Sequence, residues 1–75
     1  MSTSLNKKLV AYHISRLKDK SPDVRLKSIQ ELAQLGDPEA MEPLRDIFKN
    51  DPVLEVRKAA QEAGLTIFNA QKQDK

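Results

Sequence analysis

The chain has 75 residues and can form one small domain, because a core of this size only just offsets the entropy lost on folding. Its 32% charged and 39% hydrophobic residues are typical of a soluble globular protein and exclude extensive disorder. The absence of cysteine excludes disulfides, thiolate metal sites and thiol nucleophiles. No apolar run reaches the roughly 20 residues that span a bilayer, and the first four residues do not resemble a secretory signal, so we expect a cytoplasmic protein.

The first two predicted helices comprise residues 4–17 and 21–36. The second has its own start and stop signals, because Ser21 can cap the free backbone N–H groups, Pro22 suits the first turn and Gly36 ends the helix. The apolar faces contain Val10, Ile14 and Leu17 in the first helix, and Val24, Ser28, Ile29, Leu32, Ala33 and Leu35 in the second. Such faces require a packing partner.

The third and fourth predicted helices comprise residues 38–50 and 52–68. Pro43 lies inside the third helix, where it removes a backbone donor, so we expect an irregular first turn or a kink. Gly64 lies inside the fourth helix and predicts close approach of a neighbouring helix. The polar residues 71–75 should fray. The apolar faces contain Ala40, Met41, Leu44, Ile47 and Phe48 in the third helix, and Val56, Ala60, Ala63 and Ile67 in the fourth.

The chain repeats itself internally, which favours a helical solenoid over an irregular bundle. An offset of thirty aligns the first helix with the third, and an offset of thirty-two aligns the second helix with the fourth. The aligned pairs are Val10 with Ala40, Ala11 with Met41, Ile14 with Leu44, Leu17 with Ile47, Asp23 with Glu55, Val24 with Val56, Arg25 with Arg57, and Ser28 with Ala60. The repeating unit is therefore a helix, a short turn, an acidic residue followed by Val-Arg, and a second helix.

Two segments resemble HEAT repeats of the short variety named after phycobilisome lyases (PBS lyase HEAT-like repeats): S-P-D-V-R-L-K-S-I-Q-E-L-A-Q-L-G-D-P-E-A-M-E-P-L and D-P-V-L-E-V-R-K-A-A-Q-E-A-G-L. The resemblance implies one all-α domain over residues 1–75, a four-helix α-solenoid fragment of two helical hairpins. These hairpins are residues 4–36 and 37–70. It also implies that Arg25 and Arg57 brace neighbouring repeats by pairing with acidic loop residues.

No catalytic, cofactor-binding or metal-ligating residue is predicted. His13 is the only histidine, and Leu9 and Leu17 occupy the positions one turn away, where a ligand or a catalytic partner would be needed. Both glycines have structural explanations, so there is no phosphate-binding loop. The chain also lacks the paired His-Glu motifs of metal-dependent hydroxylases that contain related repeats. We therefore expect no enzymatic activity and no cofactor.

We expect a scaffold that binds another protein, through the surface of the second helix of each repeat or through an open end of the solenoid. The expected contact residues are Arg25, Leu26, Lys27, Leu54, Arg57 and Lys58. If Phe48, Leu54, Leu65 and Phe68 do not bury one another, the exposed patch favours self-association or docking on a partner. The resemblance implies a phycobiliprotein or another photosynthetic assembly as the partner.

Two other functions remain open. The chain could be a subunit of a phycobilin lyase, but four helices leave little volume for a tetrapyrrole, so a partner chain would be required. It could instead bind nucleic acid, because the first 30 residues carry a net charge of +5 and the remainder a net charge of −3. Tyr12, Phe48 and Phe68 are the only aromatic residues besides His13, which leaves little for stacking on bases.

Overall fold

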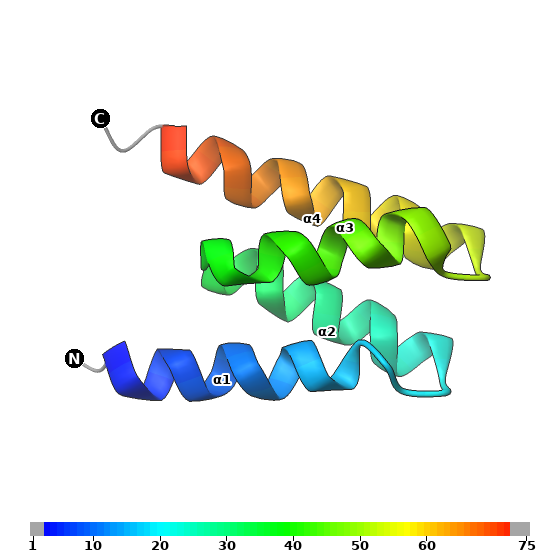
Figure 1. The fold of residues 1–75 in the computed structure, drawn as a ribbon, viewed down its shortest axis with the longest axis horizontal. Coiled ribbons are helices and arrows are strands. Elements are labelled where there is room, and N and C mark those ends of the chain that lie inside the picture. Colours follow the sequence, from blue (N-terminus) through cyan, green and yellow to red (C-terminus); the bar gives the residue numbers. More distant parts are fainter. Residues whose placement is uncertain (1–2, 73–75) are drawn as a thin grey trace.

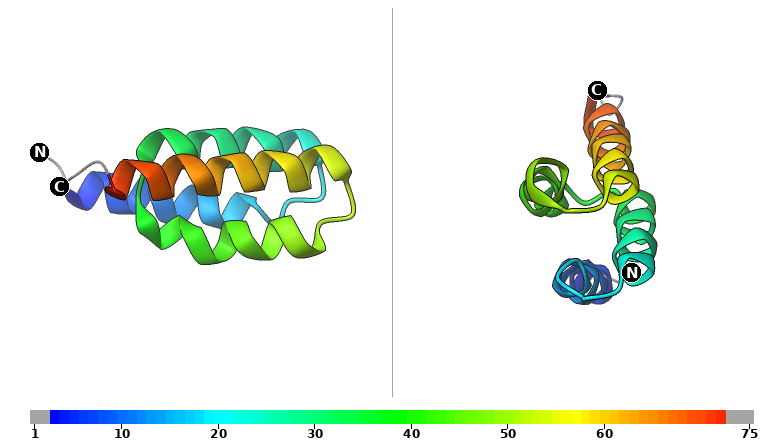
Figure 2. Two further views of the ribbon diagram at one scale, coloured as in Figure 1. Left: turned by 90° about the horizontal axis from the view of Figure 1, so that it is seen from above. Right: turned by 90° about the vertical axis from the view of Figure 1, so that its right-hand side faces the viewer.

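The structure, a computed structural model, describes residues 3–72 of the chain. This part folds into α1 (Thr3–Arg16), α2 (Pro22–Leu35), a 3-10 turn η1 (Pro38–Ala40), α3 (Met41–Asn50) and α4 (Leu54–Lys72). Consecutive helices run antiparallel and form two hairpins, α1 with α2 and α3 with α4 (Figure 1). Figure 2 shows α1 and α3 in one layer and α2 and α4 in the other. The predicted all-α solenoid fragment of two hairpins is confirmed.

One continuous core joins the two hairpins. Every helix contributes to it, which explains why neither amphipathic hairpin needs a separate core. The buried apolar residues are Val10, Leu17, Ile29, Leu32, Ala40, Leu44, Val56, Ala60, Ala63 and Ile67. Ile29, Leu32, Leu44 and Ile67 are the largest of the fully buried side chains that make up this core.

The ends of α2 follow the predicted capping signals. The hydroxyl of Ser21 accepts a hydrogen bond from the backbone N–H of Val24 at 3.4 Å, and Pro22 occupies the first turn. Gly36 adopts the left-handed conformation, with φ of 69°, and its N–H donates to the carbonyl of Leu32. Glycine adopts this backbone conformation without the steric penalty that a Cβ would bring, so the stop signal has a physical basis.

Asp37 anchors the connection between the hairpins. Its Oδ1 accepts a hydrogen bond from the backbone N–H of Glu39 at 2.8 Å, and its Oδ2 lies 3.1 Å from Nζ of Lys7 in α1. The hydrogen bond from Glu39 and, to a lesser extent, the Lys7 ammonium hold the pKa of Asp37 below its ordinary value of 3.8, although partial burial opposes them. The connection after α2 is therefore fixed to α1 and caps the 3-10 turn η1.

The start of the third helical segment is irregular, as Pro43 predicts. The segment begins as the 3-10 turn η1 and becomes α-helical at Met41, so Pro43 falls in the first turn of α3. A proline there costs no intrahelical hydrogen bond, because the first N–H groups of a helix have no partner within it.

Two expectations from the sequence are wrong. A Cβ at Gly64 would meet no atom within 4 Å, so no neighbouring helix approaches it closely. Helix α4 continues to Lys72, so Gln71 and Lys72 belong to the helix and not to a frayed tail, and Nε2 of Gln71 donates to the carbonyl of Gly36 at 3.1 Å. Residues 73–75 lie outside the described residues. No helix in the described range is both long enough and apolar enough to cross a membrane.

Candidate interaction surfaces

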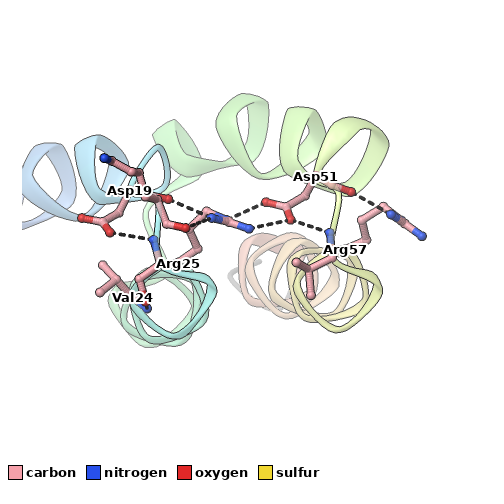
Figure 3. A network of polar contacts seen from close by, with 8 residues as sticks. Asp19, Val24, Arg25, Asp51 and Arg57 are labelled. Atoms are coloured by element: carbon pink, nitrogen blue, oxygen red, sulfur yellow. Dashed lines mark hydrogen bonds and ion pairs between the residues drawn. The ribbon is translucent and has the colours of Figure 1, made fainter.

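Arg25, in the first turn of α2, joins the two hairpins through a buried ion pair. Its Nε donates to Oδ2 of Asp51 at 2.8 Å, and its Nη2 donates to Oδ1 at 3.0 Å. Its Nη1 donates to the backbone carbonyls of Asp19 and Lys20 at 2.8 and 3.1 Å (Figure 3). Only 8% of Arg25 and 6% of Asp51 is exposed. The predicted brace between repeats is confirmed at Arg25, and we assign this residue to the repeat junction and not to a partner site.

Arg57 repeats half of this arrangement. Its Nη1 donates to the carbonyl of Asp51 at 2.7 Å, as Nη1 of Arg25 does to the carbonyl of Asp19. Each aspartate also accepts a hydrogen bond from the backbone N–H two residues later, at 2.9 Å for Asp19 and 3.0 Å for Asp51. Within residues 3–72, however, no carboxylate pairs with Arg57, whose guanidinium lies at the far end of the row in Figure 3. Asp19, Arg25, Asp51 and Arg57 thus form a row of alternating aspartate and arginine, which we call the arginine row. The guanidinium of Arg57, at the end of this row, has no carboxylate partner among the described residues.

A surface at the N-terminal end of the solenoid presents exposed apolar and basic side chains. Leu5, Leu9 and Tyr12 are 57%, 38% and 55% exposed, and their spacing places them on one face of α1. A shallow groove continues this face toward α2. We define the N-terminal end face as Leu5, Leu9, Tyr12, His13, Arg16, Val24 and Lys27.

A second surface lies at the opposite end of the solenoid, on α3 and α4. Phe48, Leu65 and Phe68 are 42%, 55% and 51% exposed, and a shallow groove runs between the two helices. The prediction that these side chains, with Leu54, could bury one another is therefore wrong, and the alternative of an exposed patch is correct. We define the C-terminal end face as Met41, Arg45, Phe48, Leu54, Gln61, Leu65 and Phe68.

The remaining predicted contact residues are scattered. Lys27 is exposed in the groove of the N-terminal end face, whereas Leu26 packs against the core. Leu54 and Lys58 are exposed near the start of α4, and their spacing places them on the same side of this helix as Gln61, Leu65 and Phe68. The predicted list missed most of the end-face residues, although the helical spacing of Leu5, Leu9 and Tyr12 was a visible signal.

Neither end face carries an arrangement typical of catalysis. Nδ1 of His13 is buried and has no hydrogen-bond partner among residues 3–72, and the ring packs edge-on against Tyr12 with the centroids 5.0 Å apart. In the same range, no three His, Cys, Asp or Glu side chains are close enough together to hold a metal ion. What the ends offer chemically is apolar and aromatic area beside cations, which is typical of protein-binding surfaces.

The fold and the arginine brace define a helical-repeat protein of the solenoid class. A family profile for HEAT repeats matches residues 3–63, and the chain belongs to this family. HEAT repeats generally mediate protein–protein interaction and typically act as scaffolds without enzymatic activity. We found no match to the chain among curated proteins or among solved structures.

Proposed function

We propose that this protein is a non-enzymatic adaptor that binds another protein through its end faces. The observation that carries the proposal is the position of the exposed large apolar side chains of residues 4–72. All seven lie on one end face or the other: Leu5, Leu9 and Tyr12 on the first, and Phe48, Leu54, Leu65 and Phe68 on the second. Solenoid repeats bury such side chains against a neighbour, so an uncovered end is a surface that gains free energy when another protein covers it.

The surface of α2 and α4 is the weaker candidate for this role. Its groove is lined largely by small or polar side chains, among them Gln30, Ala33, Ala59, Glu62 and Thr66. Such a groove offers no large aromatic or apolar anchor of the kind that dominates binding energy. Lys27, Leu54, Arg57 and Lys58 remain proposed contacts, with Lys27 and Leu54 each on an end face and Arg57 at the open end of the arginine row.

Affinity capture of the tagged protein from its native cell extract, at low and moderate salt, tests the proposal. The wild type should retain a discrete protein at moderate salt, and Leu65→Ser/Phe68→Ser should lose most of it. Gln30→Ser/Thr66→Ser, on the groove between α2 and α4, is the matched control and should retain it. Equal retention by both double variants would contradict binding through the C-terminal end face.

The same experiment separates the finer possibilities. The resemblance to phycobilisome lyase repeats makes phycobiliproteins the first partners to look for in the eluate, and a bound tetrapyrrole would support the lyase-subunit alternative. Nucleic acid alone, lost steeply as salt rises, would show that the basic first half of the chain is the functional surface, and the adaptor proposal would then be wrong.

A further inference from the structure

The two end faces correspond to the two sides of the junction inside the molecule. In the two grooves between α1 and the second repeat, repeat 1 contributes Ala11, Ser15 and Lys18, and repeat 2 contributes Glu42, Pro43 and Asp46. Thirty residues after the first set are Met41, Arg45 and Phe48, in the C-terminal end face. Thirty residues before the second set are Tyr12, His13 and Arg16, in the N-terminal end face. Each end therefore carries the half of a junction that the other end lacks.

The arginine row also carries one half of a junction at each of its ends. Inside the molecule Arg25 pairs with Asp51, and both positions recur at an offset of thirty-two as Arg57 and Asp19. Nε and Nη2, which Arg25 uses for the carboxylate, have no carboxylate partner in the described residues at Arg57. Asp19 Oδ2 lies 3.5 Å from Nη2 of Arg16, in a pair whose side chains are 29% and 40% exposed. An ion pair as exposed as this one contributes little free energy, so Asp19 can readily exchange Arg16 for another cation.

The side chains at the two ends also differ from the internal junction in a matched way. Inside, Lys18 shares its groove with the carboxylates of Glu42 and Asp46, an arrangement of opposite charges. The corresponding position at the C-terminal end is Phe48, and the positions that would face it are Tyr12 and Arg16. An aromatic ring facing an aromatic ring and a guanidinium is again complementary. The residues on both sides of this contact differ from those at the internal junction, and the two sides remain complementary.

Charge on the second helices points the same way. In the groove between α2 and α4, Gln30 and Ala59 lie on opposite sides. At the offset of thirty-two, Glu62 corresponds to Gln30 and Lys27 corresponds to Ala59. In a contact between two copies, these two positions would face each other and carry opposite charges. The first 30 residues have a net charge of +5 and the rest a net charge of −3, which favours contact between the first half of one copy and the second half of another.

We propose that copies of this chain stack head to tail, with the C-terminal end face of one copy on the N-terminal end face of the next. Arg57 of one copy then pairs with Asp19 of its neighbour, as Arg25 pairs with Asp51 inside each copy. This inference rests on the proposed function, since it names a second copy as a protein that covers the end faces. The contact is heterologous, so it extends into a chain unless an end is blocked.

Sedimentation velocity at increasing protein concentration tests the stacking. The average mass of the wild type should rise steadily with concentration, without stopping at a dimer. Asp19→Asn keeps the oxygen that accepts the hydrogen bond from the backbone of its own loop, and Arg57→Ala changes a half-buried side chain, so both variants should fold. Each alone should associate roughly 30-fold or more weakly than the wild type, because an unpaired charge remains at the contact.

An equimolar mixture of the two variants gives the decisive result. The Asp19→Asn copy has an intact C-terminal end, and the Arg57→Ala copy has an intact N-terminal end, so the mixture should form dimers and go no further. Phe48→Ser should weaken wild-type assembly, whereas Thr66→Ser, in the groove between α2 and α4 and outside the end faces, should not. Circular dichroism confirms that each variant is folded.

Two outcomes would overturn the stacking. One is a wild-type protein that stays monomeric up to about 1 mM, where even a millimolar contact would be visible. The other is a dimer that both variants form alone, because this would indicate a two-fold symmetric contact. A monomer whose end-face variants nevertheless lose a captured partner would leave the adaptor function standing, so failure of the stacking and failure of the proposed function are distinguishable.

Discussion

Arg25 and Arg57 occupy the same position in the repeat and have different environments. Arg25 uses its guanidinium on one carboxylate and two backbone carbonyls in a site where only 8% of the residue is exposed. Arg57 is half-buried and donates to one carbonyl. A buried charge that loses its partner costs more free energy than a single lost hydrogen bond, so identical substitutions at these two positions should have unequal effects.

Arg25→Ala should lower the free energy of unfolding by about 3 kcal/mol or more, because it leaves the Asp51 carboxylate buried without its cation. Arg57→Ala, the matched control, should lower it by only about 1 kcal/mol, the value of the single, part-buried hydrogen bond to the carbonyl of Asp51. Urea denaturation of dilute protein, followed by circular dichroism, measures both. Similar losses at the two positions would mean that the ion pair with Asp51 contributes little.

At the scale of the helix, the two glycines act in opposite ways. Gly36 terminates α2 with a φ of 69°, a conformation that other residues adopt only with strain. Gly64 lies within α4, where a Cβ would meet nothing within 4 Å. Its equivalent in α2 is Leu32, a fully buried core residue, so repeat 2 lacks an apolar side chain where repeat 1 has one. Because the space at Gly64 is open, the only local effect of this glycine is to lower the helix propensity of α4.

Gly64→Ala should therefore raise the free energy of unfolding by about 0.5 to 1 kcal/mol, the difference in helix propensity. Gly36→Ala should lower it by about 1 kcal/mol, because alanine is strained at positive φ. Thermal and urea unfolding of the two variants, beside the wild type, provide the comparison. A loss of stability in Gly64→Ala would show that α4 is packed more closely at this point than the structure indicates.

At the scale of the whole molecule, the two repeats share one core and one buried ion pair. Side chains from α2 and α4 are buried together, and Arg25 of the first repeat needs Asp51 of the second. Neither repeat can unfold without exposing the apolar surface of the other. Small domains with a single continuous core usually unfold in one cooperative transition, and this molecule should do so.

Ile67→Val, which removes one methyl group from a fully buried side chain in α4, should lower the free energy of unfolding by about 0.5 to 1.5 kcal/mol. The fluorescence of Tyr12, the only tyrosine, reports on the first repeat in a chain without tryptophan, whereas circular dichroism reports on all helices. Both signals should shift to the same lower urea midpoint. If the urea midpoint of the Tyr12 signal stayed at its wild-type value in this variant, the two repeats would unfold independently.

Local features of the sequence determined the helices and their order. Ser21, Gly36, Asp37 and Pro43 act on the backbone within a few residues, so the caps, the left-handed stop and the irregular start of the third segment could be predicted. The internal offset of thirty to thirty-two residues predicted two stacked hairpins, and the resemblance to HEAT repeats predicted the bracing role of Arg25. These are consequences of short-range geometry and of repetition, both of which are visible in one chain.

Only the tertiary structure decided which apolar side chains remain uncovered. Phe48, Leu65 and Phe68 look like core residues by helical spacing, but no segment among residues 3–72 packs over them. For the same reason Arg57 repeats the sequence context of Arg25 without its carboxylate. Burial depends on what lies across a face, which helical periodicity does not specify, so the sequence left open whether these side chains are covered, and the stacking of the two hairpins decided it.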